Sequence, residues 1–149
     1  MTTKEYLSQV GRLDKMIKNK ISELEQCRVM FQIIPSSAKD GERVMSTPDP
    51  DKVGAAYAKI DEMEREINSM IDAYVDKKRL IVSQIDSIPD ELNYEILFLR
   101  YIGRKTFEEI ATEIHNSYRN ATRLHGKALK EFEKMYGSTY LRDKLQDLS

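Results

Sequence analysis

The stretch TFEEIATEIHNSYRNATRLHGKAL, residues 106–129, decides the fold of the C-terminal third of the chain. Thr106 and Glu109 form a T-x-x-E capping box, which predicts the start of a helix at this point. The helix is only about two turns long before the pattern changes. Its apolar residues, expected to be buried, are Phe107, Ile110, Ala111 and Ile114.

Three residues, His115, Asn116 and Ser117, separate this helix from a second one. Ser117 is a natural N-cap, and His and Asn tolerate a positive φ better than most residues. A short helix, a three-residue turn and a capped second helix are typical of the helix-turn-helix, although most examples have glycine in the turn. The alternative is an ordinary helical bundle. The expected inward positions of the second helix are Ala121, Leu124, Ala128, Leu129 and Phe132.

Two long apolar seams precede this module, and both alternate in steps of three and four. The first predicts a helix over 4–34 that Pro35 stops, and the second predicts a helix over 53–88 that Pro89 stops. The linker 35–52 is rich in Pro and small polar residues, so we expect it to be mobile. Two helices of this length should fold back as an antiparallel hairpin.

Self-association through the hairpin is expected, because its apolar stripes are wider than one helix pair needs. The residues that widen them are Tyr6, Leu7, Met16, Ile21, Met30, Ile71 and Leu80. The predicted oligomer or partner seam comprises Val10, Ile17, Leu24, Ile60, Ile67 and Tyr74.

After Pro89 the segment DELNYEILFLRYI is helical in its spacing, and the turn GRK follows, with Gly103 expected in the left-handed conformation of a helix end. The sequence therefore predicts an all-α fold. A helical hairpin occupies 1–88, a helix-turn-helix module occupies 89–136, and a short tail occupies 137–149.

The composition excludes several classes of function. The 24 basic and 25 acidic residues nearly cancel, so any polyanion site must be local. The single cysteine excludes an intrachain disulfide, and no membrane span or signal peptide is visible, so the chain is expected to be cytoplasmic. No catalytic or cofactor fingerprint occurs, so no enzyme activity and no cofactor are predicted. Two histidines without a ligand pattern predict no metal site, and we interpret His115 as a turn residue and His125 as a surface residue.

Residues 93–132, NYEILFLRYIGRKTFEEIATEIHNSYRNATRLHGKALKEF, resemble region 4 of bacterial sigma factors, which recognises the promoter −35 element. The resemblance lies in L-R-Y, a short turn, T-x-E-E-I-A, a Ser-capped recognition helix and a closing A-L. The whole chain is similar to a family of small sigma-region-4-like proteins of phages and integrated elements, related to the ArpU and RinA types of phage transcriptional regulator. No region 2 is visible, so a complete sigma factor is not expected.

An acid-free run over 115–130 fits DNA binding, since carboxylates would repel phosphates. Arginine can read guanine, asparagine adenine and the threonine methyl thymine. The predicted base-reading residues are Tyr118, Arg119, Asn120, Thr122 and Arg123, and the predicted phosphate contacts are Arg104, Lys105, Thr106, Ser117, Lys127 and Lys130.

The resemblance places region 4 base readers at Tyr118, Arg119, Thr122 and Arg123, where typical sigma factors carry Arg, Glu, Arg and Gln. It therefore implies the docking mode and not the usual −35 sequence.

Two classes of function follow from these observations. The first is a sequence-specific transcriptional regulator of phage or mobile-element genes that binds double-stranded DNA, with RNA polymerase as a candidate second partner. The second is a helical adaptor or a phage assembly or packaging protein that acts through protein contacts. Affinity for DNA that falls steeply with salt would separate the two.

Overall fold

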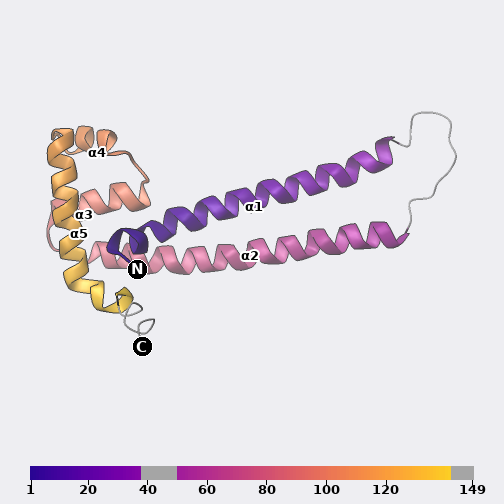
Figure 1. Cartoon of the computed structure of the whole chain (residues 1–149), viewed down its shortest axis with the longest axis horizontal. Coiled ribbons are helices and arrows are strands. Elements are labelled where there is room, and N and C mark those ends of the chain that lie inside the picture. The colour runs from indigo at the N-terminus through magenta and orange to yellow at the C-terminus, as the bar shows by residue number, and fades with distance from the viewer. Residues whose placement is uncertain (38–49, 142–149) are drawn as a thin grey trace. The chain divides into compact units, whose positions relative to one another are not determined.

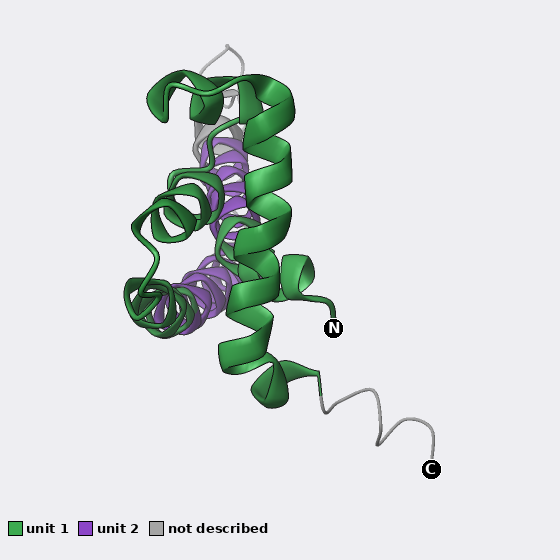
Figure 2. Ribbon diagram, turned by 90° about the vertical axis from the view of Figure 1, so that its left-hand side faces the viewer, with its two compact units in different colours: residues 1–13, 74–149 green, residues 14–73 purple. Residues whose placement is uncertain are grey.

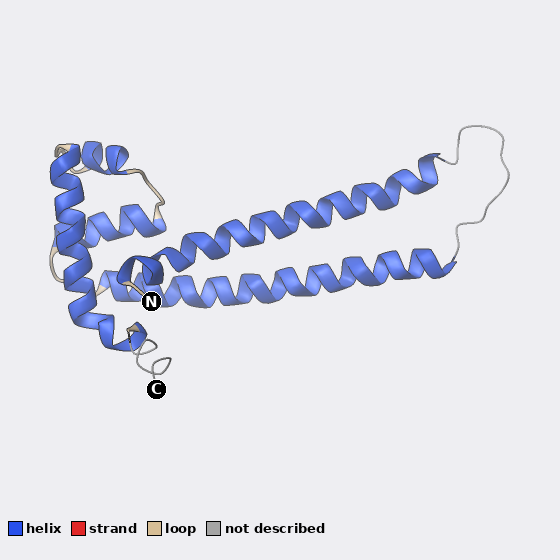
Figure 3. Ribbon diagram, viewed as in Figure 1, coloured by secondary structure: helices blue, strands red, loops and turns tan. Residues whose placement is uncertain are grey.

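The computed structural model describes the backbone of residues 1–37 and 50–141, with the side chains of these ranges except 32–37. Helices are the only regular structure in these ranges (Figure 3). The prediction of an all-α fold is therefore confirmed for the described residues. In chain order the elements are α1 (Thr3–Ser37), α2 (Pro50–Asp86), α3 (Glu91–Leu97), the π-helical segment η1 (Phe98–Ile102), α4 (Phe107–Glu113) and α5 (Tyr118–Tyr140) (Figure 1).

The ends of the two long helices differ from the prediction by one to three residues. α1 continues past Pro35 to Ser37, so this proline does not end the helix as predicted. Pro50 is the first residue of α2, where the missing N–H would have no partner in any case. The predicted linker 35–52 was too wide at both ends, and its middle, 38–49, lies outside the described residues.

The chain divides into two compact units (Figure 2). Unit 1 contains residues 1–13 and 74–149, and unit 2 contains residues 14–73. The division between these units does not fall at residue 88, where the sequence predicts it. The first turns of α1 and the last turns of α2 share a hydrophobic core with the C-terminal helices, which sequence periodicity within each helix does not reveal.

The larger core of unit 1 is built around aromatic residues from both ends of the chain. Tyr6 stacks on Tyr140 with ring centroids 4.3 Å apart, and its hydroxyl donates to Gln84 Oε1 at 2.7 Å. The sequence predicts a tail over 137–149, but α5 continues to Tyr140 and buries this side chain in the core. Residues 142–149 of the predicted tail lie outside the described residues. The buried members are Tyr6, Leu7, Val10, Ile81, Ile85, Ile88, Leu97, Tyr101, Ala128, Phe132 and Tyr140.

A smaller core joins α3, α4 and α5. Ile96, Ile110 and Leu124, one from each helix, are its buried centre. Leu92, Leu99, Phe107 and Ile114 are partly buried around them. This core fixes the short α4 against the start of α5.

In unit 2 the described side chains of α1 and α2 contact each other at several positions. Lys20 lies 3.9 Å from Glu66, Arg28 pairs with Glu64, and the Phe31 and Tyr57 rings meet edge to face at 4.8 Å. The partner's number in α2 falls as the number in α1 rises, so the two helices run in opposite directions in this unit.

The predicted partner seam is largely occupied by the chain's own packing. Val10 is buried in unit 1, Ile17, Leu24 and Ile67 are buried in unit 2, and Ile60 and Tyr74 are half-buried. Their burial within the chain leaves little of this seam open to a partner. An outside partner of unit 2 would instead meet the exposed apolar side chains Met16, Ile21, Val29, Met30, Tyr57 and Ile71.

Candidate nucleic-acid interface

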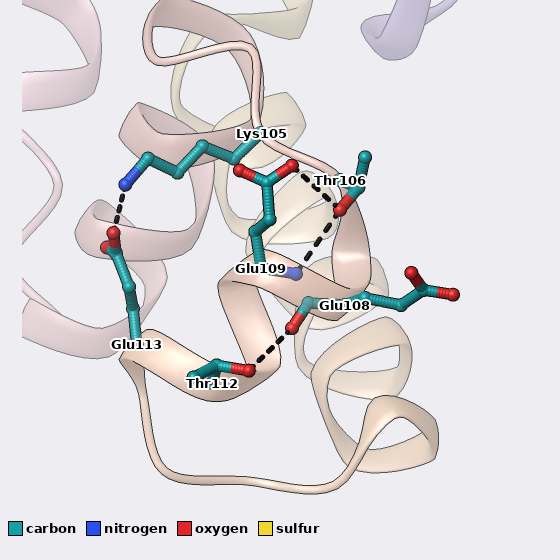
Figure 4. Close-up of polar contacts among 6 residues, drawn as sticks. All are labelled: Lys105, Thr106, Glu108, Glu109, Thr112 and Glu113. Carbon is teal, nitrogen blue, oxygen red and sulfur yellow. Dashed lines mark hydrogen bonds and ion pairs between the residues drawn. The ribbon is translucent and has the colours of Figure 1, made fainter.

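The capping box at the start of α4 is present. Thr106 has an extended backbone, and its hydroxyl oxygen accepts a hydrogen bond from the Glu109 N–H at 3.2 Å. The same hydroxyl donates to Glu109 Oε1 at 3.1 Å (Figure 4). The helix start predicted at Thr106 is confirmed.

The turn between α4 and α5 is a Schellman motif that has histidine where glycine is usual. His115 has φ of 55°, and its N–H donates to Thr112 O at 3.3 Å. The Asn116 N–H donates to Ala111 O at 2.9 Å. Ser117 then caps α5 by accepting from the Asn120 N–H at 3.1 Å. The predicted capping by Ser117 is confirmed, and its hydroxyl hydrogen remains able to donate to a phosphate.

The turn before α4 differs from the prediction in which residue is left-handed. Gly103 has φ of −72°, whereas Arg104 has φ of 56°. Gly103 is needed for space, because a Cβ there would lie 2.9 Å from the Leu99 carbonyl oxygen. The Arg104 side chain lies against α1, where a Cβ on Gly11 would be 3.3 Å from Arg104 Nε. This packing weakens the predicted phosphate role of Arg104.

The surface of α4 is acidic where phosphate contacts were predicted. Lys105 forms an ion pair with Glu113, and Glu108 and Glu109 occupy the first turn (Figure 4). Carboxylates in these places repel phosphates. The geometry therefore does not favour Lys105 and Thr106 as phosphate contacts.

The outer face of α5 carries a stripe of five cations. Arg119, Arg123, Lys127, Lys130 and Lys134 follow one another in steps of four, four, three and four, which places them on one side of a helix. All five are exposed, and none forms an ion pair with another described residue. We call these five residues the basic stripe. Its inward counterpart is the buried set Ala121, Leu124, Ala128 and Phe132.

The five predicted base-reading residues differ in what they can present. Tyr118 is 55 % exposed and meets the edge of Phe107 at 6.4 Å. The Thr122 hydroxyl donates to Arg119 O at 2.8 Å, so the methyl is its free contact group. The Asn120 amide is already bonded on both sides, to Asn116 and Arg123. Among these five residues, only Arg119 and Arg123 present charged hydrogen-bond donors at the surface.

The interpretation of His125 as a surface residue was wrong. This side chain is 5 % exposed, its Nε2 lies 2.9 Å from the Tyr101 hydroxyl, and Phe107 meets it edge to face at 4.9 Å. Burial, together with the positive charges of Lys4 and Arg100, lowers the pKa of His125 to about 4. Burial also raises the pKa of Tyr101 to about 12. The sequence signal was its position four residues after inward Ala121 and next to Leu124.

The described residues contain neither a metal-binding cluster nor a membrane-spanning helix. Among residues 1–37 and 50–141, no group of three or more His, Cys, Asp or Glu side chains is placed to hold a metal ion. Within the same part of the chain, no helix has an apolar stretch long enough to cross a bilayer.

Comparison of the chain with protein-family models, with curated proteins and with solved structures found no match. Function therefore has to follow from the geometry and charge of the site itself.

Proposed function

We propose that the chain is a sequence-specific DNA-binding transcriptional regulator of phage or mobile-element genes. In this proposal a helix-turn-helix formed by α4 and α5 docks on double-stranded DNA as sigma region 4 does. The first turns of α5 enter the major groove, which has the width for one helix and a distinct donor and acceptor pattern for each base pair.

The observation that carries the proposal is the basic stripe of α5. Five exposed cations on one face have no acidic partner among the described residues, in a chain whose total charge is −1. Lys134 lies 15 positions after Arg119, which is about 22 Å of helix at 1.5 Å per residue. A cationic face of this length fits a phosphate backbone better than it fits a compact acidic site.

The stripe divides into two parts by its place on the helix. Arg119 and Arg123 lie in the first two turns, beside the exposed Tyr118, where a recognition helix contacts base edges. Lys127, Lys130 and Lys134 lie further on, where the helix leaves the groove and meets phosphates. The acidic α4 then supports α5 from behind and contributes few phosphate contacts.

The other parts of the proposal concern the long helices. They would form an antiparallel hairpin ahead of the helix-turn-helix module, and the exposed apolar side chains of unit 2 would bind a second copy of the chain or RNA polymerase. A dimer would place two α5 helices about one helical turn of DNA apart, as in other helix-turn-helix dimers.

A helical adaptor or a phage assembly or packaging protein remains the second candidate. Two observations favour it, namely the acidic surface of α4 and the exposed apolar residues of unit 2, such as Met30 at 66 % and Tyr57 at 55 % exposure. Such a protein would bind a protein partner and show no sequence preference on duplex DNA.

Selection of bound fragments from the source genome, followed by binding curves at several salt concentrations, tests the proposal. The affinity of the parent protein should fall with salt with a slope of about 0.9 per neutralised phosphate. Lys127→Ala should weaken all sequences alike and lower that slope by about one unit. Arg119→Ala and Arg123→Ala should each reduce affinity by about 1–3 kcal/mol and relax preference at one position.

Arg65→Ala is the matched control, because Arg65 is an exposed arginine of α2 outside the module. It should leave the binding curves unchanged. If folded Arg119→Ala and Arg123→Ala bind the selected duplex with the parent's affinity and preference, base readout by α5 is excluded and the adaptor becomes the better explanation.

A further inference from the structure

A chain of side-chain hydrogen bonds runs from the helix-turn-helix turn to Arg123. Asn116 Nδ2 donates to Ile114 O at 3.0 Å, and Asn120 Nδ2 donates to Asn116 Oδ1 at 2.6 Å. Arg123 then donates to Asn120 Oδ1 from Nε at 3.1 Å and from a terminal guanidinium nitrogen, Nη2, at 2.8 Å. Three side chains are thus tied to a backbone carbonyl in a well-packed turn.

The two ends of this chain determine the orientation of both amides. A guanidinium has only donors, so the atom of Asn120 that faces Arg123 must be its oxygen. The Ile114 carbonyl can only accept, so the atom of Asn116 that faces it must be its nitrogen. The Asn120 nitrogen is then left to bond the Asn116 oxygen, and every bond in the chain has one donor and one acceptor.

The contact with Asn120 occupies one edge of the Arg123 guanidinium and leaves another edge open. Nε and Nη2 share the Asn120 oxygen, so the N–H groups still free are both on Nη1 and one on Nη2. The free pair on Nη1 and Nη2 points away from the amide in the fixed fork geometry of arginine. That spacing matches the O6 and N7 acceptors of guanine.

We infer that Asn120 is a positioning residue for Arg123, and that Arg123 reads one guanine in the major groove with its Nη1 and Nη2 donors. This inference rests on the proposed function and makes it more specific. It also replaces the expectation that Asn120 pairs with adenine, because both ends of that amide are used within the protein. Arg119, which has no such clamp, is the matched arginine for comparison.

A double-mutant cycle on the selected duplex tests the assignment. Arg123→Ala should lower affinity by about 5- to 150-fold and remove the preference for guanine at one position. Asn120→Ala should lower the preference for guanine at the same position by about 2- to 12-fold. This factor corresponds to the cost of ordering an unrestrained arginine side chain on binding. In the Arg123→Ala background, Asn120→Ala should have little further effect. In the Arg119→Ala background its effect should be undiminished.

Two further measurements separate positioning from a merely structural role. Asn120→Asp keeps an acceptor for Arg123, so it should retain the guanine preference even where its negative charge lowers overall affinity. In the free protein, ¹⁵N relaxation should show a rigid Arg123 Nε–H that becomes mobile in Asn120→Ala, while Arg119 is unchanged. Alanine is a better helix former than asparagine, so the variant should fold.

The inference is overturned if Asn120→Ala alters preference at a different base pair from Arg123→Ala, if the two effects add, or if Arg123 Nε–H is equally mobile in parent and variant. Those results would leave the proposed function standing. Loss of any sequence preference or salt-dependent duplex binding in the parent protein would remove both.

Discussion

The two units of the chain bury their apolar residues to very different extents. Unit 1 has two clusters of buried side chains drawn from five helices and a π-helical segment. In unit 2 the buried apolar residues among those described are Ile17, Leu24 and Ile67, while six large apolar side chains remain exposed. The difference follows from geometry, since two helices can cover only one stripe of each other whereas a third and fourth helix enclose a core.

This difference fits a division of labour in which unit 1 holds chemical groups in fixed positions. The hydrogen bonds of Asn116 and Asn120, the Schellman turn and the buried His125 all lie on helices that the two cores of unit 1 pack together. Unit 2 instead has an exposed apolar surface and few buried side chains. The largest expected effect therefore comes from a substitution that unfolds one unit and leaves the other folded.

Replacement of Ile67 by Asp should unfold unit 2 and leave the helices α3 to α5 intact. The substitution removes a side chain that is 7 % exposed, which costs about 2–5 kcal/mol for truncation alone, and a buried charge adds to that loss. Native-state hydrogen exchange should show faster exchange in residues 14–37 and 50–73 and unchanged protection in α5.

Ile71→Asp is the matched control, one turn further along α2 and 37 % exposed. Its folding stability should change by less than about 0.5 kcal/mol. If a second copy covers this surface, the variant should also dissociate in sedimentation while remaining folded. Equal loss of protection in both units with Ile67→Asp would show that they unfold together and would contradict the comparison.

Acid should destabilise unit 1 through its buried His125. Unit 2 has no histidine, because both histidines of the chain belong to unit 1. The pKa of His125 is about 4 in the folded chain and about 6.5 when unfolded. Above pH 6.5 the imidazole is neutral in both states. Between pH 6.5 and 4 only the unfolded state takes up the proton, so stability falls by up to about 3 kcal/mol as pH falls, and the effect is complete below pH 4.

Urea unfolding at a series of pH values measures this effect as the difference between parent and His125→Gln. The two proteins have the same carboxylates, so the contribution of these groups cancels in the difference. The difference should therefore change between pH 4 and 6.5, where the proton uptake of His125 differs between the folded and unfolded states. His115→Asn is the matched control, because it removes the other histidine of the chain, which is exposed, and asparagine accepts the positive φ. A parent and His125→Gln pair with parallel pH profiles would contradict burial of a neutral imidazole.

The parts of the structure that local rules govern were predictable from the sequence. Thr106 and Ser117 are predictable as caps, because each side chain accepts a hydrogen bond from the backbone N–H only three residues later. The alternating spacing of Ile17, Leu24 and Ile67 correctly identified the buried stripes, since periodicity reports which face of a helix is covered.

The parts that depend on residues distant in sequence were not predictable. Nothing near Tyr6 indicates that it stacks on Tyr140, so the sequence placed the two in separate domains. His125 was judged by residue type, and only its Tyr101 and Phe107 neighbours make burial tolerable. The chemistry of its amide predicts that Asn120 pairs with adenine, whereas its bonds to Asn116 and Arg123 depend on the conformation of the turn.

The smallest expected effect concerns the turn that holds α4 against α5. His115 adopts φ of 55°, a conformation that is unfavourable by roughly 1–2 kcal/mol for most L-residues and freely open to glycine. His115→Gly should therefore raise the unfolding free energy, by up to about 1 kcal/mol once the greater freedom of glycine in the unfolded chain is subtracted. His115→Ala is the matched variant, because it removes the imidazole and keeps the strained φ, so it should bring no gain. Thermal unfolding at pH 8, where His125 is neutral in both states, isolates the backbone effect. Equal stability of the glycine and alanine variants would mean that the turn relaxes out of the left-handed region. The fixed bonds from Asn116 to Arg123 would then lose their anchor.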